Sequence, residues 1–138
     1  MIAVTTLPLG SLSAITRRIT LRGALMLDAA VTGVNGAAYL LAAGPLGELL
    51  GLSPTLLRVL GGILVAFALA VWLTATRSAV PRGVVVAIVA VNAAWAVGSV
   101  AVAIGGWTSP TTIGALWVVA QAIVVGAFAE LQATALRR

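Results

Sequence analysis

The sequence predicts an all-α membrane protein, folded as a bundle of four transmembrane helices. Of its 138 residues, 62% are hydrophobic and 8% are charged, whereas soluble domains carry about 25% charged residues. The chain also contains four long apolar segments, and each has the length that a helix needs to cross a hydrocarbon core of about 30 Å. We therefore expect the lipid bilayer to be the solvent for most of this chain.

The four spans are expected within one transmembrane domain, residues 21–138, which follows a cytoplasmic arm of residues 1–20. Backbone exposed to lipid must be hydrogen-bonded within its own segment, and continuous apolar runs of this length fit helices rather than strands of a barrel. The predicted spans are residues 21–44, 55–76, 83–104 and 111–133.

A short motif recurs along the chain. The tripeptide Ser53-Pro54-Thr55 recurs 56 residues later as Ser109-Pro110-Thr111. Asn35 likewise has a counterpart, Asn92, at a similar distance along the chain. A serine before a proline is typical of a helix start, so both motifs predict the start of a span. The repetition would fit two tandem helical hairpins that arose by duplication. The favoured interpretation is two independent helix starts of a common type.

The arginines predict the orientation. All eight basic residues are arginine, which is typical of GC-rich bacterial coding. Seven of them lie on the side of the two termini, whereas Arg58 lies on the other side. The positive-inside rule therefore places both termini in the cytoplasm and the protein in the bacterial inner membrane. Because these arginines are single or paired rather than gathered in a patch, the sequence does not indicate nucleic-acid binding.

The stretch between the first two spans is apolar although it is expected outside the membrane core. Residues 45–52 read PLGELLGL, with Glu48 as the one charged residue. Such a segment favours a short helix that lies along the membrane interface. A lid over an external opening is the alternative interpretation.

The residue types exclude several kinds of chemistry. The chain has no histidine and no cysteine, so disulfides, thiol nucleophiles and the usual zinc and haem ligands are excluded. We expect no catalytic residue, no metal site and no cofactor. An intramembrane enzyme would require two converging carboxylates, and Asp28 and Glu130 are the only acidic pair expected at a similar depth.

One polar stripe stands out in the first span. Asp28, Thr32, Asn35 and Tyr39 follow one another at helical spacing, so they lie on one side of the helix. Polar side chains inside a membrane span are unfavourable against lipid, and each is therefore a candidate ligand or coupling residue. Asp28 is either a proton carrier in a dry interior or an anchor that pairs with Arg22 or Arg82.

The third and fourth spans add a second set of polar residues. Counted from the inner membrane boundary, these residues share one central layer with Asn35; they are Asn92, Trp95, Trp117 and Gln121. The layer has three interpretations: hydrogen-bonded contacts between helices, a small ligand cavity, or a path for ions or protons. The second span is almost purely apolar, which predicts that it faces lipid or a partner.

The pattern resembles a group of small, uncharacterised four-helix membrane proteins of high-GC bacteria. The likeness covers residues 21–133 and rests on Leu21-Arg22 leading to Asp28, Gly51-Leu52, Asn92 with Trp95, and Trp107 to Pro110 leading to Gly114. The chain is also similar to small multidrug-resistance transporters in having a carboxylate in its first span, although here it is Asp28 and the external loop is longer. DoxX-like proteins share only size and helix number.

Two functional hypotheses follow. The first is a non-enzymatic accessory subunit or self-assembling membrane module, whose partners are the lipid bilayer and a second copy or another membrane protein. The second is a small oligomeric transporter or ligand-binding membrane protein that uses Asp28 and the central polar layer.

Overall fold

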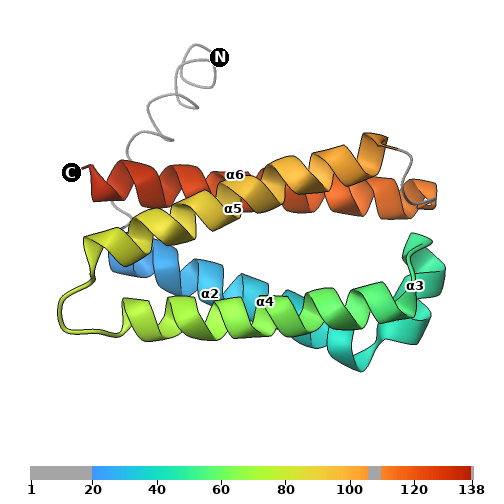
Figure 1. Cartoon of the computed structure of the whole chain (residues 1–138), viewed down its shortest axis with the longest axis horizontal. Coiled ribbons are helices and arrows are strands. Elements are labelled where there is room, and N and C mark those ends of the chain that lie inside the picture. The colour runs from blue at the N-terminus through green and yellow to red at the C-terminus, as the bar shows by residue number, and fades with distance from the viewer. Residues whose placement is uncertain (1–19, 106–109, 138) are drawn as a thin grey trace, which may run out of the picture.

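The computed structural model describes residues 20–105 and 110–137, and over these residues it is an all-α bundle without strands (Figure 1). Four helices are long and apolar enough to span a membrane, which confirms the predicted fold class. A fifth, shorter helix joins the first two spans. The elements are α2 (Leu21–Leu41), α3 (Ala43–Leu50), α4 (Pro54–Ala75), α5 (Arg82–Ile104) and α6 (Thr112–Leu136).

The ends of the spans follow local capping chemistry. Ser53 caps α4 by accepting from the backbone N–H of Leu56 at 3.3 Å, and Pro54 is the first helical residue, as predicted. In α6 the cap is Thr111, whose hydroxyl accepts from Gly114 N at 3.0 Å. The predicted cap at Ser109 lies outside the described residues. Thr111 replaces it because its hydroxyl reaches the free N–H groups of the first turn.

The four spans form two antiparallel hairpins. In Figure 1, α2 lies against α4 and α5 against α6, whereas α4 and α5 barely touch. The hairpins meet mainly through α2 and α6, the first and last spans. Because the number of spans is even, the start of α2 and the end of α6 lie at the same end of the bundle.

The two helices of the first hairpin approach closely at a pair of glycines. A Cβ atom built on Gly36 would lie 2.9 Å from the carbonyl oxygen of Gly61, and a Cβ built on Gly61 would lie 2.8 Å from that of Gly36. Side chains at either position would therefore push the backbones apart. Small residues at such crossings let membrane helices pack by van der Waals contact, since lipid supplies no hydrophobic drive between them.

Helix α3 closes the bundle at the end opposite the termini (Figure 1). It ends at Gly51, whose φ of 70° is the left-handed conformation that glycine adopts without strain. The start of α6 binds its last carbonyls: Thr111 donates through its hydroxyl to Leu49 O at 2.7 Å and through its N–H to Leu50 O at 3.1 Å. The short helix expected over residues 45–52 is thus present, beginning two residues earlier.

At the other end, arginines bind backbone carbonyls. The guanidinium of Arg22 donates to the carbonyl oxygens of Ala75 and Arg77, and that of Arg82 to Leu136 O at 2.9 Å. These contacts satisfy the carbonyls at the C-terminal ends of α4 and α6, where a positive charge also complements the helix dipole. Neither arginine bonds to Asp28 in the described part of the chain, so the predicted ion-pair anchor is wrong.

The most exposed span is α5 rather than α4. In its most apolar window 17% of residues are buried, compared with 28% in α4 and 39% in α2. The second span, which we expected to face lipid or a partner, is less exposed than α5, although most of its window is exposed as well. The apolar composition of α4 does not prevent burial, because one side of it packs along α2.

Candidate ligand-binding cavity and its polar clusters

The Asp28 carboxylate lies at the centre of a buried hydrogen-bond cluster. Its Oδ1 accepts from the hydroxyl of Thr32 at 2.9 Å, and its Oδ2 accepts from Asn92 Nδ2 at 2.8 Å and from Gln132 Nε2 at 2.7 Å. Asn92 Nδ2 also lies 3.1 Å from Gln132 Oε1. We call these four residues the inner cluster; it links α2, α5 and α6.

The inner cluster is built entirely from uncharged donors around one acid. Asp28 and Gln132 are fully buried, and Asn92 and Thr32 are nearly so. Such a cluster satisfies both carboxyl oxygens without a cationic partner, because the Thr32 hydroxyl and both amides donate to them. The arrangement holds the first span against the last two.

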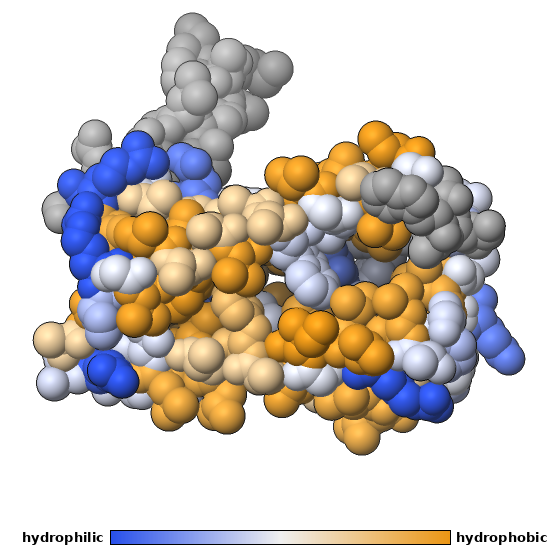
Figure 2. Space-filling view, viewed as in Figure 1, coloured by the Kyte–Doolittle hydropathy of each residue, from blue (hydrophilic) through white to orange (hydrophobic). Residues whose placement is uncertain are grey.

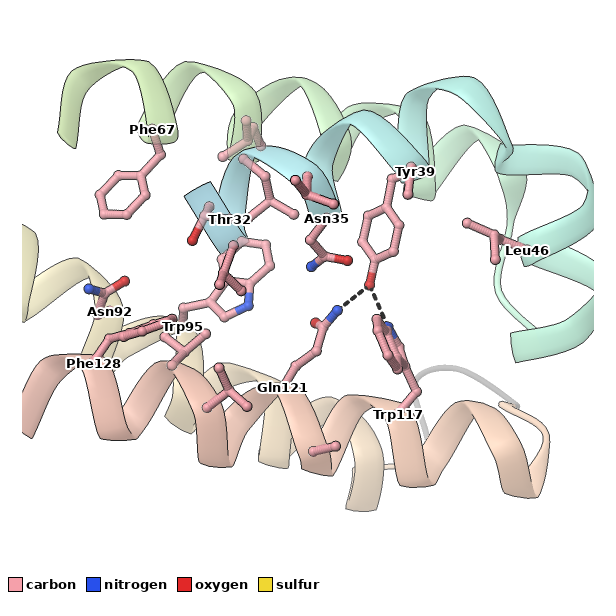
Figure 3. A pocket seen from close by; sticks show the side chains of 18 of the residues that line it. Thr32, Asn35, Tyr39, Leu46, Phe67, Asn92, Trp95, Trp117, Gln121 and Phe128 are labelled. Atoms are coloured by element: carbon pink, nitrogen blue, oxygen red, sulfur yellow. Dashed lines mark hydrogen bonds between the residues drawn. The ribbon is translucent and has the colours of Figure 1, made fainter. Parts of the chain in front are cut away.

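A second, outer cluster lies nearer α3. The hydroxyl of Tyr39 on α2 accepts from the indole N–H of Trp117 at 2.9 Å and from Gln121 Nε2 at 2.6 Å, both on α6 (Figure 3). The phenol ring is buried, whereas the two α6 side chains remain partly open. Tyr39 therefore connects the two hairpins by its polar tip and packs by its ring.

The single polar layer expected from depth counting is wrong, since the structure divides it. Asn92 belongs to the inner cluster, whereas Trp117 and Gln121 belong to the outer one. Counting residues from a membrane boundary assumes upright helices that start at one level. Stagger between spans and the reach of an amide side chain change which residues meet.

Between the two clusters the hairpins enclose a cavity of about 990 Å³. Figure 2 shows one face of the molecule hollowed there, with apolar side chains around the opening. All five helices contribute to its walls, which are almost entirely hydrocarbon, including Phe67, Val91 and Phe128 towards one end and Leu46 and Leu49 of α3 towards the other. This volume lies at the upper end of the usual range of ligand pockets, about 300–1,000 Å³.

The polar groups in the cavity wall are few and uncharged. Thr32 and Asn92 reach it from the inner cluster, and Tyr39, Trp117 and Gln121 reach it from the outer cluster. No charged side chain of the described residues lines the cavity. The site therefore suits a neutral molecule that is mostly apolar.

Asn35 and Trp95 differ from the other polar residues of the wall. Both line the cavity from opposite hairpins (Figure 3), and both are half-buried. Within the described residues, neither side chain makes a hydrogen bond, although Asn92 and Gln121 are engaged. An indole N–H and an amide therefore face the cavity with their hydrogen-bonding capacity unused.

The structure thus brings all eight candidate residues to one inter-hairpin region, in three groups rather than one. Asp28 lies behind Thr32 and Asn92, which form the cavity's inner wall. Glu130, the other acid expected at a similar depth, is exposed and bonds within α6 to Thr134 at 3.5 Å. The two carboxylates therefore do not converge on one site.

Sequence reasoning missed Gln132, although a signal was present. Gln132 follows Gln121 by eleven residues, which is about three helical turns, so the two lie on one stripe of α6. The same spacing separates Asp28 from Tyr39 on α2. A polar pair at matching spacing on two helices indicates two levels of contact, which is what the inner and outer clusters are.

Comparisons with known proteins leave the cavity as the main guide to function. The chain matches no protein-family model, and neither the curated proteins nor the solved structures contain a significant match to it.

Proposed function

We propose that this chain is a non-enzymatic membrane protein that binds a neutral, bilayer-soluble amphipathic molecule between its two hairpins. The observation that carries the proposal is the cavity of about 990 Å³, which has hydrocarbon walls and a few uncharged polar groups. Ligand pockets of this composition bind by apolar burial, and a small number of polar groups orient the ligand.

The position of the opening favours entry from the lipid. The cavity lies where α4 and α5 barely touch, and apolar side chains border much of its opening in Figure 2. A molecule dissolved in the bilayer would reach such an opening sideways without crossing water. A charged ligand is disfavoured, since burying an unpaired charge in apolar walls costs far more than polar contacts return.

Two tryptophans with similar exposure make this proposal testable. Trp117 lines the cavity and is 40% exposed, and Trp72 lies on α4 outside it and is 43% exposed. Single-tryptophan variants of the full chain, with the other tryptophans replaced by phenylalanine, would be reconstituted in phosphatidylcholine vesicles. The probe is methyl 9,10-dibromostearate, a neutral ester whose bromines quench indole fluorescence on contact.

We expect low mole fractions of the probe to quench Trp117 at least twice as strongly as Trp72. Ala120→Phe, which fills the cavity from α6, should remove that difference. Ala93→Phe, on an exposed position of α5 outside the cavity wall, should preserve it. Equal quenching of Trp72 and Trp117 at all probe concentrations would contradict the proposal, because it would mean that the cavity binds the probe no better than bulk lipid does.

A second candidate function is the accessory or self-assembling module, and the exposure of α5 favours it. Only 17% of that helix's most apolar window is buried, and Gly98 has open space beside it, so another helix could pack there closely. Native mass spectrometry after mild detergent extraction separates the two candidates. A stoichiometric second protein or copy supports the module, and a bound small molecule on a monomer supports the binder.

We further propose the bacterial cell membrane as the location, with both termini in the cytoplasm. The support is the arginine distribution: Arg22, Arg77, Arg82 and Arg137 lie at the end of the bundle where the described chain starts and finishes, and Arg58 lies near the other end. Such a bias follows the positive-inside rule.

A further inference from the structure

We propose that the ligand carries a carbonyl-type hydrogen-bond acceptor, and that the Trp95 indole N–H and the Asn35 amide hold it. This inference rests on the proposed binding function and specifies its ligand class. The occupant is a neutral amphiphile such as a long-chain ketone, ester or quinone, whose apolar part fills the remaining cavity.

Most hydrogen-bond donors in the cavity wall already have an acceptor within the protein. The amides of Asn92 and Gln121 and the indole of Trp117 already donate to partners within the protein, namely Asp28 and Tyr39. Trp95 and Asn35 make no hydrogen bond among the described residues although both line the cavity. A buried polar group without a partner is unfavourable in an apolar surrounding, so a ligand that supplies one gains affinity.

The Trp95 indole and the Asn35 amide differ in the hydrogen bonds that they can form. An indole N–H donates and cannot accept, and an amide does either. A ligand that satisfies both must therefore present an acceptor, and a carbonyl oxygen with two lone pairs accepts from two donors at once. A hydrocarbon would leave both groups without partners.

Trp95 comes from α5 and Asn35 from α2, so the two residues lie on opposite hairpins (Figure 3). Hydrophobic walls extend to either side of them, towards Phe67 and towards Leu46. The acceptor would therefore sit between these apolar walls, in the middle of the cavity.

The test compares two competitors of equal chain length, 2-tridecanone and n-tridecane. The reporters are Trp117 and, where it is present, Trp95, both in the cavity wall of the full chain with Trp72→Phe and Trp107→Phe, and both are quenched by the dibromostearate ester. Each competitor displaces the quencher and restores fluorescence, and the mole fraction that restores half of it is measured in each variant. Because each variant is normalised to its own maximum, differences in starting intensity do not matter.

We expect 2-tridecanone to compete at a lower mole fraction than tridecane with Trp95 present. Trp95→Phe removes the N–H but keeps an aromatic ring, and should raise the half-restoring mole fraction of the ketone about tenfold while leaving that of tridecane unchanged. Asn35→Leu should act in the same direction. The value for tridecane in the same variant is the control for aromatic packing, because an alkane fills the cavity but forms no hydrogen bond.

Three results would overturn the inference, and they separate it from the proposed function. Equal competition by ketone and alkane in the background protein rejects the acceptor site while the binding function stands. An equal shift of both competitors in both variants shows a packing role for Trp95 and Asn35, and also rejects the site. If neither molecule displaces the quencher, both the binding function and this inference fail. Circular dichroism of each variant checks that the helices persist.

Discussion

Gln132 Nε2 donates a hydrogen bond of 2.7 Å to Asp28 Oδ2, which joins residues 104 positions apart in the chain. The bond ties the inner end of the first span to the inner end of the last. Because α4 and α5 barely touch, this contact and the bond from Asn92 carry much of the polar connection between the hairpins. The outer halves of the hairpins stand further apart and enclose the cavity.

Asp28→Asn should be tolerated, whereas Asp28→Ala should not. The amide oxygen of asparagine can take the place of Oδ2 and accept from Asn92 and Gln132. Its NH₂ then faces the hydroxyl of Thr32, which can accept instead of donate. We expect a change in the free energy of unfolding within about 1 kcal/mol for Asp28→Asn, and a loss of about 2–4 kcal/mol for Asp28→Ala. Alanine leaves the Gln132 amide N–H and the Thr32 hydroxyl without their acceptor, whereas Asn92 keeps its bond to Gln132 Oε1.

Unfolding in mixed detergent–dodecyl sulfate micelles, followed by circular dichroism, measures both variants. If Asp28→Asn proved as unstable as Asp28→Ala, the negative charge and not the hydrogen-bond geometry would be what the cluster requires. Unchanged stability of Asp28→Ala would show that the inner cluster does not hold the hairpins together.

Two neighbouring glycines of α4 should respond oppositely to alanine. A Cβ at Gly61 would lie 2.8 Å from the carbonyl oxygen of Gly36, whereas a Cβ at Gly62 meets nothing within 4 Å. We expect Gly61→Ala to destabilise by about 1–3 kcal/mol through overpacking. Gly62→Ala should be neutral or stabilise by up to about 1 kcal/mol, since alanine favours helix. Thermal unfolding in detergent compares the melting temperatures of Gly61→Ala and Gly62→Ala. Equal melting temperatures would refute the close α2–α4 crossing.

Gly114→Ala should open the junction between α3 and α6. A Cβ on Gly114 would overlap the carbonyl oxygen of Leu50, whereas one on Gly126, in the same helix, has open space. The clash displaces Leu50 from the N–H of Thr111. Amide hydrogen exchange, read by mass spectrometry, should therefore become at least about tenfold faster in α3 for Gly114→Ala, which is a loss of about 1.4 kcal/mol of local stability.

Gly126→Ala is the matched control for that measurement and should leave exchange in α3 as it is in the unmodified protein. Exchange in α3 that stays slow in Gly114→Ala would mean that α3 is held by contacts other than its bonds to Thr111.

Single cysteines should report the orientation, because the chain has none of its own. Ser78→Cys places a thiol in the exposed connector between α4 and α5, and Glu48→Cys places one on the exposed side of α3 at the opposite end. With both termini in the cytoplasm, a membrane-impermeant maleimide added to intact cells should label Glu48→Cys and spare Ser78→Cys. Labelling of both in broken cells is the control, and the reverse pattern in intact cells would invert the topology.

The polar stripe of the first span could be predicted from the sequence, but its hydrogen-bond partners could not. The stripe from Asp28 to Tyr39 was visible because helical spacing is a local property, and three of its four members are buried. The partners of that stripe were not visible. The sequence position of an amide or indole does not indicate which helix the side chain will contact. Counting residues from the membrane boundary also ignores the tilt and stagger of the helices. Gln132 was missed although its spacing from Gln121 matches that of Asp28 and Tyr39, and Arg22, an alternative partner of Asp28, bonds to backbone carbonyls instead.

The sequence by itself determined the four spans and their helical form, because both depend on runs of apolar residues and on local caps such as Ser53. Tertiary structure alone decided that the polar residues divide into two clusters with a cavity between them. The physical reason is the solvent. Lipid accepts any apolar helix surface, so hydropathy specifies which segments enter the membrane. The arrangement of the spans depends on close contacts such as Gly36 with Gly61 and on a few directed hydrogen bonds.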